Sequence, residues 1–88
     1  MTVYVTAVHL TGGERSEHIA SVRWRATDNS TGQSTREAMV EFIDGGGVAR
    51  VSDGQNDIAI GVVHATPPYI RTYADKVWTD NLLALPRF

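Results

Sequence analysis

Residues 34–47 read STREAMVEFIDGGG, and this segment decides the fold because it carries a helix start, a helical face and a helix stop. Ser34 and Glu37 have the spacing of a capping box, in which Ser34 caps the helix and Glu37 reaches back. Apolar side chains then recur on one helical face: Met39, Phe42 and Ile43. The glycines at 45–47 supply the left-handed residue with which many helices end. The sequence therefore predicts one helix.

Two strands are expected before this helix. Thr2–Leu10 is rich in Val, Tyr and Thr and has apolar groups on both faces, which predicts a central strand covered on both sides. His18–Thr27 alternates with a period of two, with Val22 and Trp24 on one face, as in a half-buried strand. We expect these strands to form a hairpin, and the polar residues Asp28–Gln33 to be a loop.

Short extended segments are expected after the helix. Val48–Ser52 and Ile58–His64 flank a turn at residues 53–57, which predicts a second hairpin. Pro67-Pro68 ends it, because proline cannot donate a hydrogen bond to a sheet. The tail then comprises Tyr69–Tyr73, a tight turn at residues 74–76, Val77–Thr79, and a capped helical turn that starts at Asp80 and stops before Pro86.

The predicted fold is α+β in a single domain, residues 1–88. The order is β-β-α-β-β followed by a C-terminal β-hairpin and a short helical turn. We expect a small, mainly antiparallel sheet with one helix packed on one face.

Composition narrows the classes of protein that this chain can represent. A net charge of −2 argues against a general nucleic-acid binder, whose surface would be basic. The apolar runs are too short for a transmembrane helix, and the N-terminal residues lack the basic start of a secretory signal. With no cysteine, the chain has no disulfide and no thiolate ligand. We therefore expect a cytoplasmic protein with no membrane partner.

Residues capable of catalysis or metal binding have simpler structural interpretations. His9, His18 and His64 lie on predicted strands, where His9 and His18 could face each other, but they lack the spacing of zinc ligands. The carboxylates suit a solvated helix face, turns and caps. The glycines at 45–47 follow a helix, so they do not form a phosphate-binding helix start. The sequence predicts no metal, no cofactor and no catalytic residue, and an enzyme is the less favoured class.

The candidate binding residues lie in the tail. If Ile70 points inward, alternate side chains of the same strand line an exposed face that resembles a stacking and hydrogen-bonding platform. The alternative is that the two tyrosines belong to the core, with their hydroxyls satisfied. Arginines on the face opposite Trp24 could add positive charge. The predicted ligand-binding residues are Tyr69, Arg71, Tyr73, Trp78, Arg23 and Arg25.

The tail also carries a family resemblance. Residues 61–88, GVVHATPPYIRTYADKVWTDNLLALPRF, together with HIASVRWR and STREAMVEFI before them, resemble the uncharacterised bacterial family called domain of unknown function 3892. The likeness covers essentially the whole chain, except that Asp75-Lys76 stands where Asp-Gly is expected in the small turn. The resemblance implies a domain boundary, with no activity, cofactor or catalytic residue.

Three function classes stay open at this point. The favoured one is a small non-enzymatic binding or protein-interaction domain, in which self-association to a homodimer would protect an unpaired sheet edge. The alternative is a nucleic-acid or nucleotide-binding regulatory or sequestering protein that uses the Tyr/Arg strand face and needs a local basic patch. The third is a small enzyme or metal-binding protein.

Overall fold

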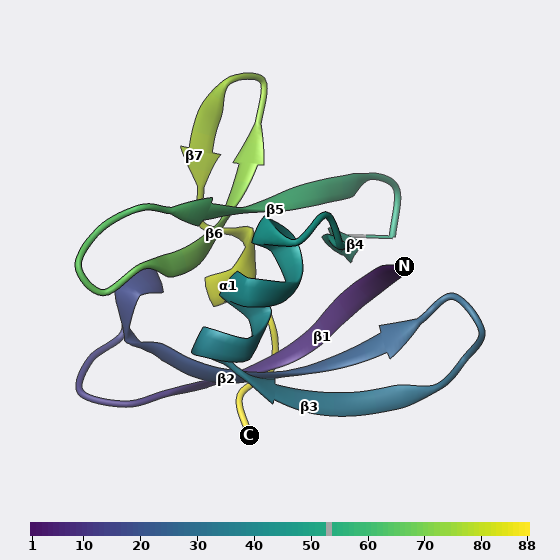
Figure 1. Cartoon of the computed structure of the whole chain (residues 1–88), viewed down its shortest axis with the longest axis horizontal. Helices are drawn as coiled ribbons and strands as arrows, with labels where there is room; N and C mark the ends of the chain where they lie inside the picture. Colours follow the sequence, from purple (N-terminus) through teal and green to yellow (C-terminus); the bar gives the residue numbers. More distant parts are fainter. Residues whose placement is uncertain (53) are drawn as a thin grey trace.

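In the computed structural model, which describes residues 1–52 and 54–88, a seven-stranded sheet curls around one α-helix (Figure 1). The helix is α1 (Arg36–Asp44), and two 3₁₀ turns accompany it, η1 (Ser16–His18) and η2 (Asn81–Ala84). The strands are β1 (Thr2–Leu10), β2 (Ile19–Ala26), β3 (Thr31–Thr35), β4 (Val48–Ser52), β5 (Asp57–Val63), β6 (Tyr69–Ala74) and β7 (Val77–Thr79). Asp53, the first residue of the predicted turn at 53–57, lies outside the described residues.

The sheet is mixed, with the strand order β3-β2-β1-β4-β5-β6-β7. Every neighbouring pair is antiparallel except β1 and β4, which run parallel. The parallel pair arises because the chain crosses on α1 from β3 to the other side of β1. The predicted class, a small sheet with one helix, is confirmed, but the sheet has one more strand than predicted and joins both hairpins into one layer.

The predicted loop at Asp28–Gln33 is wrong in its second half, because β3 begins at Thr31. Its pairing with β2 runs from Thr31 opposite Arg25 to Thr35 opposite Ser21. Main-chain hydrogen bonds to β2 hold this strand in place. Because it contains no apolar side chain, its sequence lacks the alternation of apolar and polar residues that predicts a strand. Asn29, with φ of 70°, makes the left-handed residue of the connecting turn.

The predicted capping box of Ser34 and Glu37 is wrong, because the cap lies one residue later and places Ala38, not an acidic residue, at the third helical position. Thr35 is the N-cap, and its Oγ1 accepts a hydrogen bond from the Ala38 main-chain N–H at 3.2 Å. Ser34 still belongs to β3, where its Oγ accepts the indole N–H of Trp24 at 3.0 Å. The glycine stop is confirmed: the helix is followed by Gly46 with φ of 101°.

The strand β1 is central, as predicted, but only one of its faces is covered. Its pairing with β2 shifts between Val5 and Ala7, and this irregularity moves Val8 onto the same buried face as Val3 and Val5. The opposite face carries Thr6 and other side chains that are exposed or half-buried. The prediction that both faces of this strand are covered is wrong, because a bulge changes which face of the sheet the residues after it belong to.

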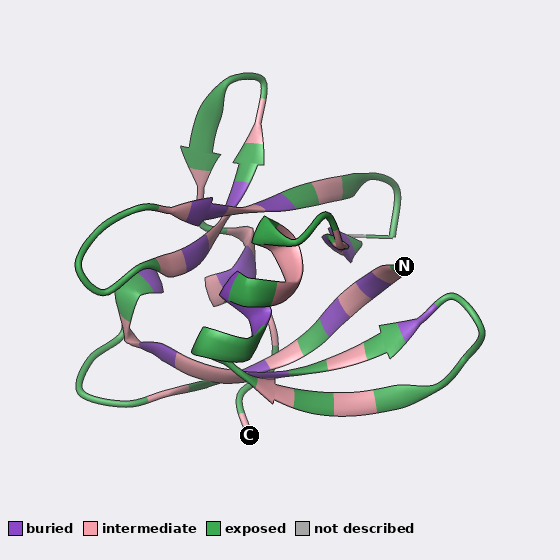
Figure 2. Ribbon diagram, viewed as in Figure 1, coloured by how far each residue is buried: buried purple, intermediate pink, exposed green. Residues whose placement is uncertain are grey.

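The core lies between the sheet and α1, and the C-terminal residues close it (Figure 2). Leu82 of η2 is fully buried among the strand residues. The last residues then run beside β1 where β4 no longer pairs with it: the Val8 N–H donates to the Pro86 carbonyl at 2.9 Å, and the Phe88 N–H donates to the Val8 carbonyl at 3.2 Å. The tail therefore completes the sheet as well as the core.

Candidate functional site

The β6–β7 hairpin extends away from the body of the molecule and forms an arm (Figure 1). We call residues 69–79 the β6–β7 arm. Its turn consists of Asp75 and Lys76, with φ of 52° and 66°. Two consecutive positive φ values are those of a type I′ hairpin turn, whose twist matches that of the flanking strands. The predicted tight turn is confirmed, although Lys76 stands where glycine is preferred.

Large apolar side chains are exposed on this arm. Their exposed fractions are 39% for Tyr73, 60% for Val77 and 37% for Trp78. The rings of Tyr73 and Trp78 meet edge to face with centroids 5.0 Å apart. The indole of Trp78 also covers Gly61 on β5, where an added Cβ would lie 3.2 Å from it. The arm therefore presents a packed aromatic pair with an exposed valine beside it.

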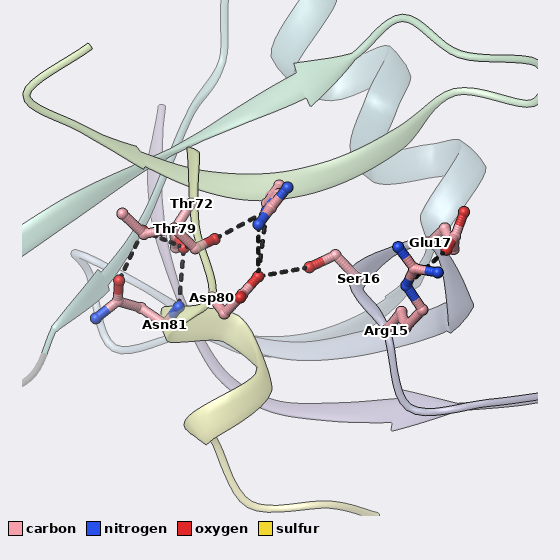
Figure 3. Close-up of polar contacts among 8 residues, drawn as sticks. Arg15, Ser16, Glu17, Thr72, Thr79, Asp80 and Asn81 are labelled. Atoms are coloured by element: carbon pink, nitrogen blue, oxygen red, sulfur yellow. Dashed lines mark hydrogen bonds and ion pairs between the residues drawn. The ribbon is translucent and has the colours of Figure 1, made fainter. Parts of the chain in front are cut away.

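The base of the arm is fixed by a buried polar cluster (Figure 3). Thr72 is fully buried, and its hydroxyl donates to the Thr79 carbonyl at 2.8 Å and accepts the Asn81 main-chain N–H at 3.0 Å. The Thr79 hydroxyl lies 2.8 Å from the Thr72 hydroxyl and 2.7 Å from the Asn81 side-chain oxygen. Because β6, β7 and η2 share these bonds, the arm leaves the body at a defined angle.

Arg71 and Asp80 form an ion pair on the neighbouring side of β6. The Nη2 of Arg71 lies 3.0 Å from the Asp80 carboxylate, and its Nε donates to the same carboxylate and to the Thr79 carbonyl, each at 3.2 Å. Ser16 of η1 approaches this carboxylate at 3.5 Å (Figure 3). The carboxylate of Asp80 therefore binds Arg71 in place of the predicted cap, and no side-chain cap bond forms at η2.

A pocket of about 190 Å³ opens beside this pair, between the arm and the loop before η1. Tyr69 and Arg71 line it together with charged residues of both signs, which are Glu14, Arg15, Glu17 and Asp80. Arg15 and Glu17 pair with each other at 3.2 Å. The pocket is polar and its charges are largely compensated within the molecule, so it offers no concentrated charge to a ligand.

A shallow groove of about 540 Å³ borders the arm on the outer face of the sheet. Its floor includes Ala59 of β5, which lies between Arg50 of β4 and Tyr73 of β6 in the cross-strand register. The small alanine side chain leaves room there. The guanidinium-bearing residue Arg50 therefore lies on one side of the groove, and the aromatic residue Tyr73 lies on the other.

The same row of the sheet continues as Arg50, Tyr4 and Arg25, which are paired in register across β4, β1 and β2. The Tyr4 hydroxyl donates to the Asp57 carboxylate at 2.9 Å, and this hydrogen bond raises the pKa of Tyr4 above its usual value. Within residues 1–52 and 54–88, no carboxylate lies within ion-pair distance of Arg25 or Arg50. The outer face is thus rich in arginine and tyrosine.

The structure distributes the predicted binding residues over separate places. Ile70 is buried, so Tyr69, Arg71 and Tyr73 belong to the outer face and not to the core. Tyr73 and Trp78 lie together on the arm, whereas Tyr69 and Arg71 line the polar pocket. Arg23 and Arg25 lie on β2, separated from β6 by three intervening strands, roughly 19 Å along the sheet.

Arg23 has a partner of its own. Its guanidinium carbon lies 4.2 Å from the ring centroid of Phe88, which is a cation–π contact. The ring of Phe88 also lies against His9, at a centroid distance of 5.7 Å. The aromatic C-terminal residue is therefore held by β1 and β2, far along the sheet from the arm.

The histidines do not converge. His9 pairs with Ser21 across β1 and β2, so the predicted facing of His9 and His18 is wrong. The Arg15 main-chain N–H donates to His18 at 3.2 Å, and His64 lies 3.6 Å from Asp44. Among the described residues, no group of three or more His, Asp or Glu side chains is placed to hold a metal ion.

Sequence reasoning missed some residues of these surfaces. The sequence predicts a strand at Val77 and no role for it, although a two-residue turn after an outward Tyr73 is enough to place Val77 near the tip. Arg50 lies between the buried Ala49 and Val51, so a period-two reading of that strand could have placed it outward. Its alignment with Tyr4 depends on the parallel pairing, which no local pattern indicates.

The fold and its surfaces define a small, β-rich domain with one covering helix and an exposed aromatic arm. A family model described as protein of unknown function (DUF3892) matches residues 4–86, and the chain belongs to this family. The resemblance seen in the sequence is thereby confirmed. No curated protein and no solved structure shows significant similarity to the chain. Among the described residues, no helix is long and apolar enough to cross a membrane.

Proposed function

We propose that this protein is a non-enzymatic protein-interaction domain whose binding element is the β6–β7 arm. One observation carries the proposal: Tyr73, Val77 and Trp78 are exposed together on a hairpin that extends from the body. Tyrosine and tryptophan are enriched among the residues that dominate binding energies. Apolar side chains that are exposed next to one another often mark a surface that binds another protein.

The anchoring of the arm supports the same function. The buried hydroxyl of Thr72 and the pair of Arg71 with Asp80 hold the base of the arm in one geometry. A binding element that is ordered before association loses less conformational entropy when it binds. The matching partner surface is a shallow apolar groove with polar edges, because the Asp75-Lys76 turn lies at the tip of the arm.

The test is site-specific photo-crosslinking in the host cell with a benzophenone amino acid at Val77. Glu41, exposed on α1, is the matched control position. We expect a discrete crosslinked protein from position 77 that position 41 does not give. The captured protein is then purified, and its Kd is measured for the wild-type chain and for Val77→Lys. We expect at least tenfold weaker binding for Val77→Lys, with an unchanged unfolding midpoint.

Two results would overturn the proposal. One is the same set of crosslinks from positions 77 and 41. The other is a Kd that Val77→Lys leaves unchanged, because a lysine cannot replace a valine in a desolvated interface without cost.

A second candidate function, binding of single-stranded nucleic acid, is favoured by the row Arg25–Tyr4–Arg50 on the outer face. Three acidic side chains, Glu37, Glu41 and Asp44, are on α1, whereas Asp57 lies at this row and accepts the Tyr4 hydroxyl. Arginine and tyrosine side by side suit phosphate contacts and base stacking.

Fluorescence anisotropy with a short labelled oligothymidine at low salt tests this candidate. We expect binding that weakens with salt and that is lost in Arg25→Gln/Arg50→Gln. Absence of binding by the wild-type chain at low salt would exclude it.

A further inference from the structure

We infer that β3 is a self-association edge, at which two copies of this chain pair antiparallel about a two-fold axis at Gln33. The inference is independent of the β6–β7 arm, because β3 and β7 lie at opposite edges of the sheet (Figure 1).

The phase of the β2–β3 ladder decides which main-chain groups of β3 point outward. The Ala26 N–H donates to the Ser30 carbonyl at 2.8 Å, and hydrogen-bonded pairs then alternate with pairs that are not bonded. The register places Thr31, Gln33 and Thr35 in the pairs that are not hydrogen-bonded to β2. Their N–H groups and the carbonyls of Thr31 and Gln33 therefore point away from β2, while the Thr35 carbonyl begins the helix as its N-cap residue.

This arrangement is self-complementary. In an antiparallel pair centred on Gln33, the two Gln33 residues exchange both of their main-chain hydrogen bonds. Each Thr35 N–H then meets the Thr31 carbonyl of the other copy. Thr31 and Thr35 also become cross-strand neighbours, and threonine pairs of this kind are favourable.

The side chains of β3 do nothing to prevent such pairing. Natural edges are usually protected by charged residues or proline, but residues 31–35, TGQST, contain neither. The opposite edge, β7, is flanked by Asp75, Lys76 and Asp80. Behind β3, the indole of Trp24 lies against Gly32 and bonds to Ser34, which holds the edge strand in place.

The outward main-chain groups select a second copy as the occupant, because they are arranged symmetrically on both sides of Gln33. The charged residues at the ends of β3 are bonded within the molecule: Asp28 accepts from Ser30, and Arg36 donates to the Glu17 carbonyl at 2.9 Å and pairs with Glu37 at 3.7 Å. A five-residue strand buries less than the roughly 1,200–2,000 Å² of a standard interface. We therefore expect a weak, concentration-dependent dimer.

Sedimentation velocity over a micromolar concentration series is the first arm of the test. The weight-average mass of the wild-type chain should rise toward the dimer with concentration. Gln33→Lys, which places two like charges on the axis, should remain a monomer, and Gln33→Thr should dimerise as the wild type does. Circular dichroism and the thermal midpoint verify that each variant is folded.

Cysteine crosslinking is the second arm, and the absence of native cysteine makes it clean. In the paired strands two Gln33 Cα atoms lie about 5.5 Å apart, within disulfide range, whereas two Thr31 Cα atoms lie roughly 14 Å apart. Under mild oxidant, Gln33→Cys should form a covalent dimer much faster than Thr31→Cys. A wild-type chain that stays monomeric, a Gln33→Lys variant that still dimerises, or equal crosslinking at both positions would overturn the inference.

Discussion

The two edges of the sheet, β3 and β7, offer different groups to a partner. The edge β3 has outward main-chain groups at alternate residues, and its side chains are polar and uncharged. The edge β7 is only three residues long, and its exposed groups are the apolar side chains of Val77 and Trp78. A strand edge with main-chain groups suits the addition of another strand, whereas exposed aromatic side chains suit a groove.

The anchoring of the two edges differs as well. The β7 edge is joined to the core through Thr72 and Leu82, both fully buried. The β3 edge is joined through β2 and through the contact of Trp24 with Ser34, and it has no fully buried residue of its own. We therefore expect a substitution near the β7 edge to lower the free energy of unfolding more than the same kind of substitution in β3.

The largest expected effect is the loss of stability in Leu82→Ala. This side chain is fully buried next to the arm, so its truncation removes apolar contacts and leaves a cavity. We expect a decrease of about 2–5 kcal/mol in the free energy of unfolding, measured by urea denaturation.

Val77→Ala is the matched control for this change, because Val77 is 60% exposed. Its free energy of unfolding should stay within about 0.5 kcal/mol of the wild type. Equal losses in both variants would mean that the tip of the arm is a packing element and not a free surface.

An intermediate effect is expected for Thr72→Val, which keeps the shape of the side chain and removes its hydroxyl. The Thr79 carbonyl and the Asn81 N–H then lose a buried partner. We expect a loss of about 1–3 kcal/mol in the free energy of unfolding.

Thr31→Val makes the same chemical change at the other edge, where the side chain is exposed. It should change the free energy of unfolding by no more than about 0.5 kcal/mol. A similar loss in Thr72→Val and Thr31→Val would contradict the difference in anchoring.

The smallest expected effect concerns pH at the turn before β3. The side-chain and main-chain hydrogen bonds from Ser30 lower the pKa of Asp28 below its usual value of 3.8. A lowered pKa stabilises the folded state above the unfolded value, and this contribution is lost as the pH falls through the folded value.

Asp28→Asn keeps the accepting oxygen and removes the charge, so it isolates this contribution. The thermal midpoint of the wild type should exceed that of Asp28→Asn at pH 7, and the difference should shrink below about pH 4. A difference that stays constant through the acid range would show that the charge of Asp28 does not contribute.

The parts of the fold that the sequence predicted are those with local causes. The helix follows from an apolar face and a glycine stop. The direction of Ile70 was left open by the sequence, and its complete burial is what turns Tyr69, Arg71 and Tyr73 outward. The parallel pairing of β1 with β4 and the bulge near Val5 depend on contacts distant in sequence, so no local pattern indicates them. The strand β3 was missed because main-chain pairing, and not its side chains, makes it a strand.

The candidate binding residues also differ in whether local sequence or the tertiary fold determines their positions. Tyr73 and Trp78 were predicted to share a surface, and a short hairpin brings them together. Arg23 and Arg25 were grouped with them on charge alone, and the strand order separates them. The role of Arg71 could not be read from the sequence, because its pairing with Asp80 depends on how the chain turns after β7.

The most direct test of the separate roles of the two edges is sedimentation velocity of the wild type, Gln33→Lys and Val77→Lys over one concentration series. We expect the wild type and Val77→Lys to approach the dimer mass together, while Gln33→Lys stays at the mass of the 9.6 kDa chain. A Val77→Lys variant that is monomeric while Gln33→Lys dimerises would contradict this expectation, because the arm would then be the self-association surface.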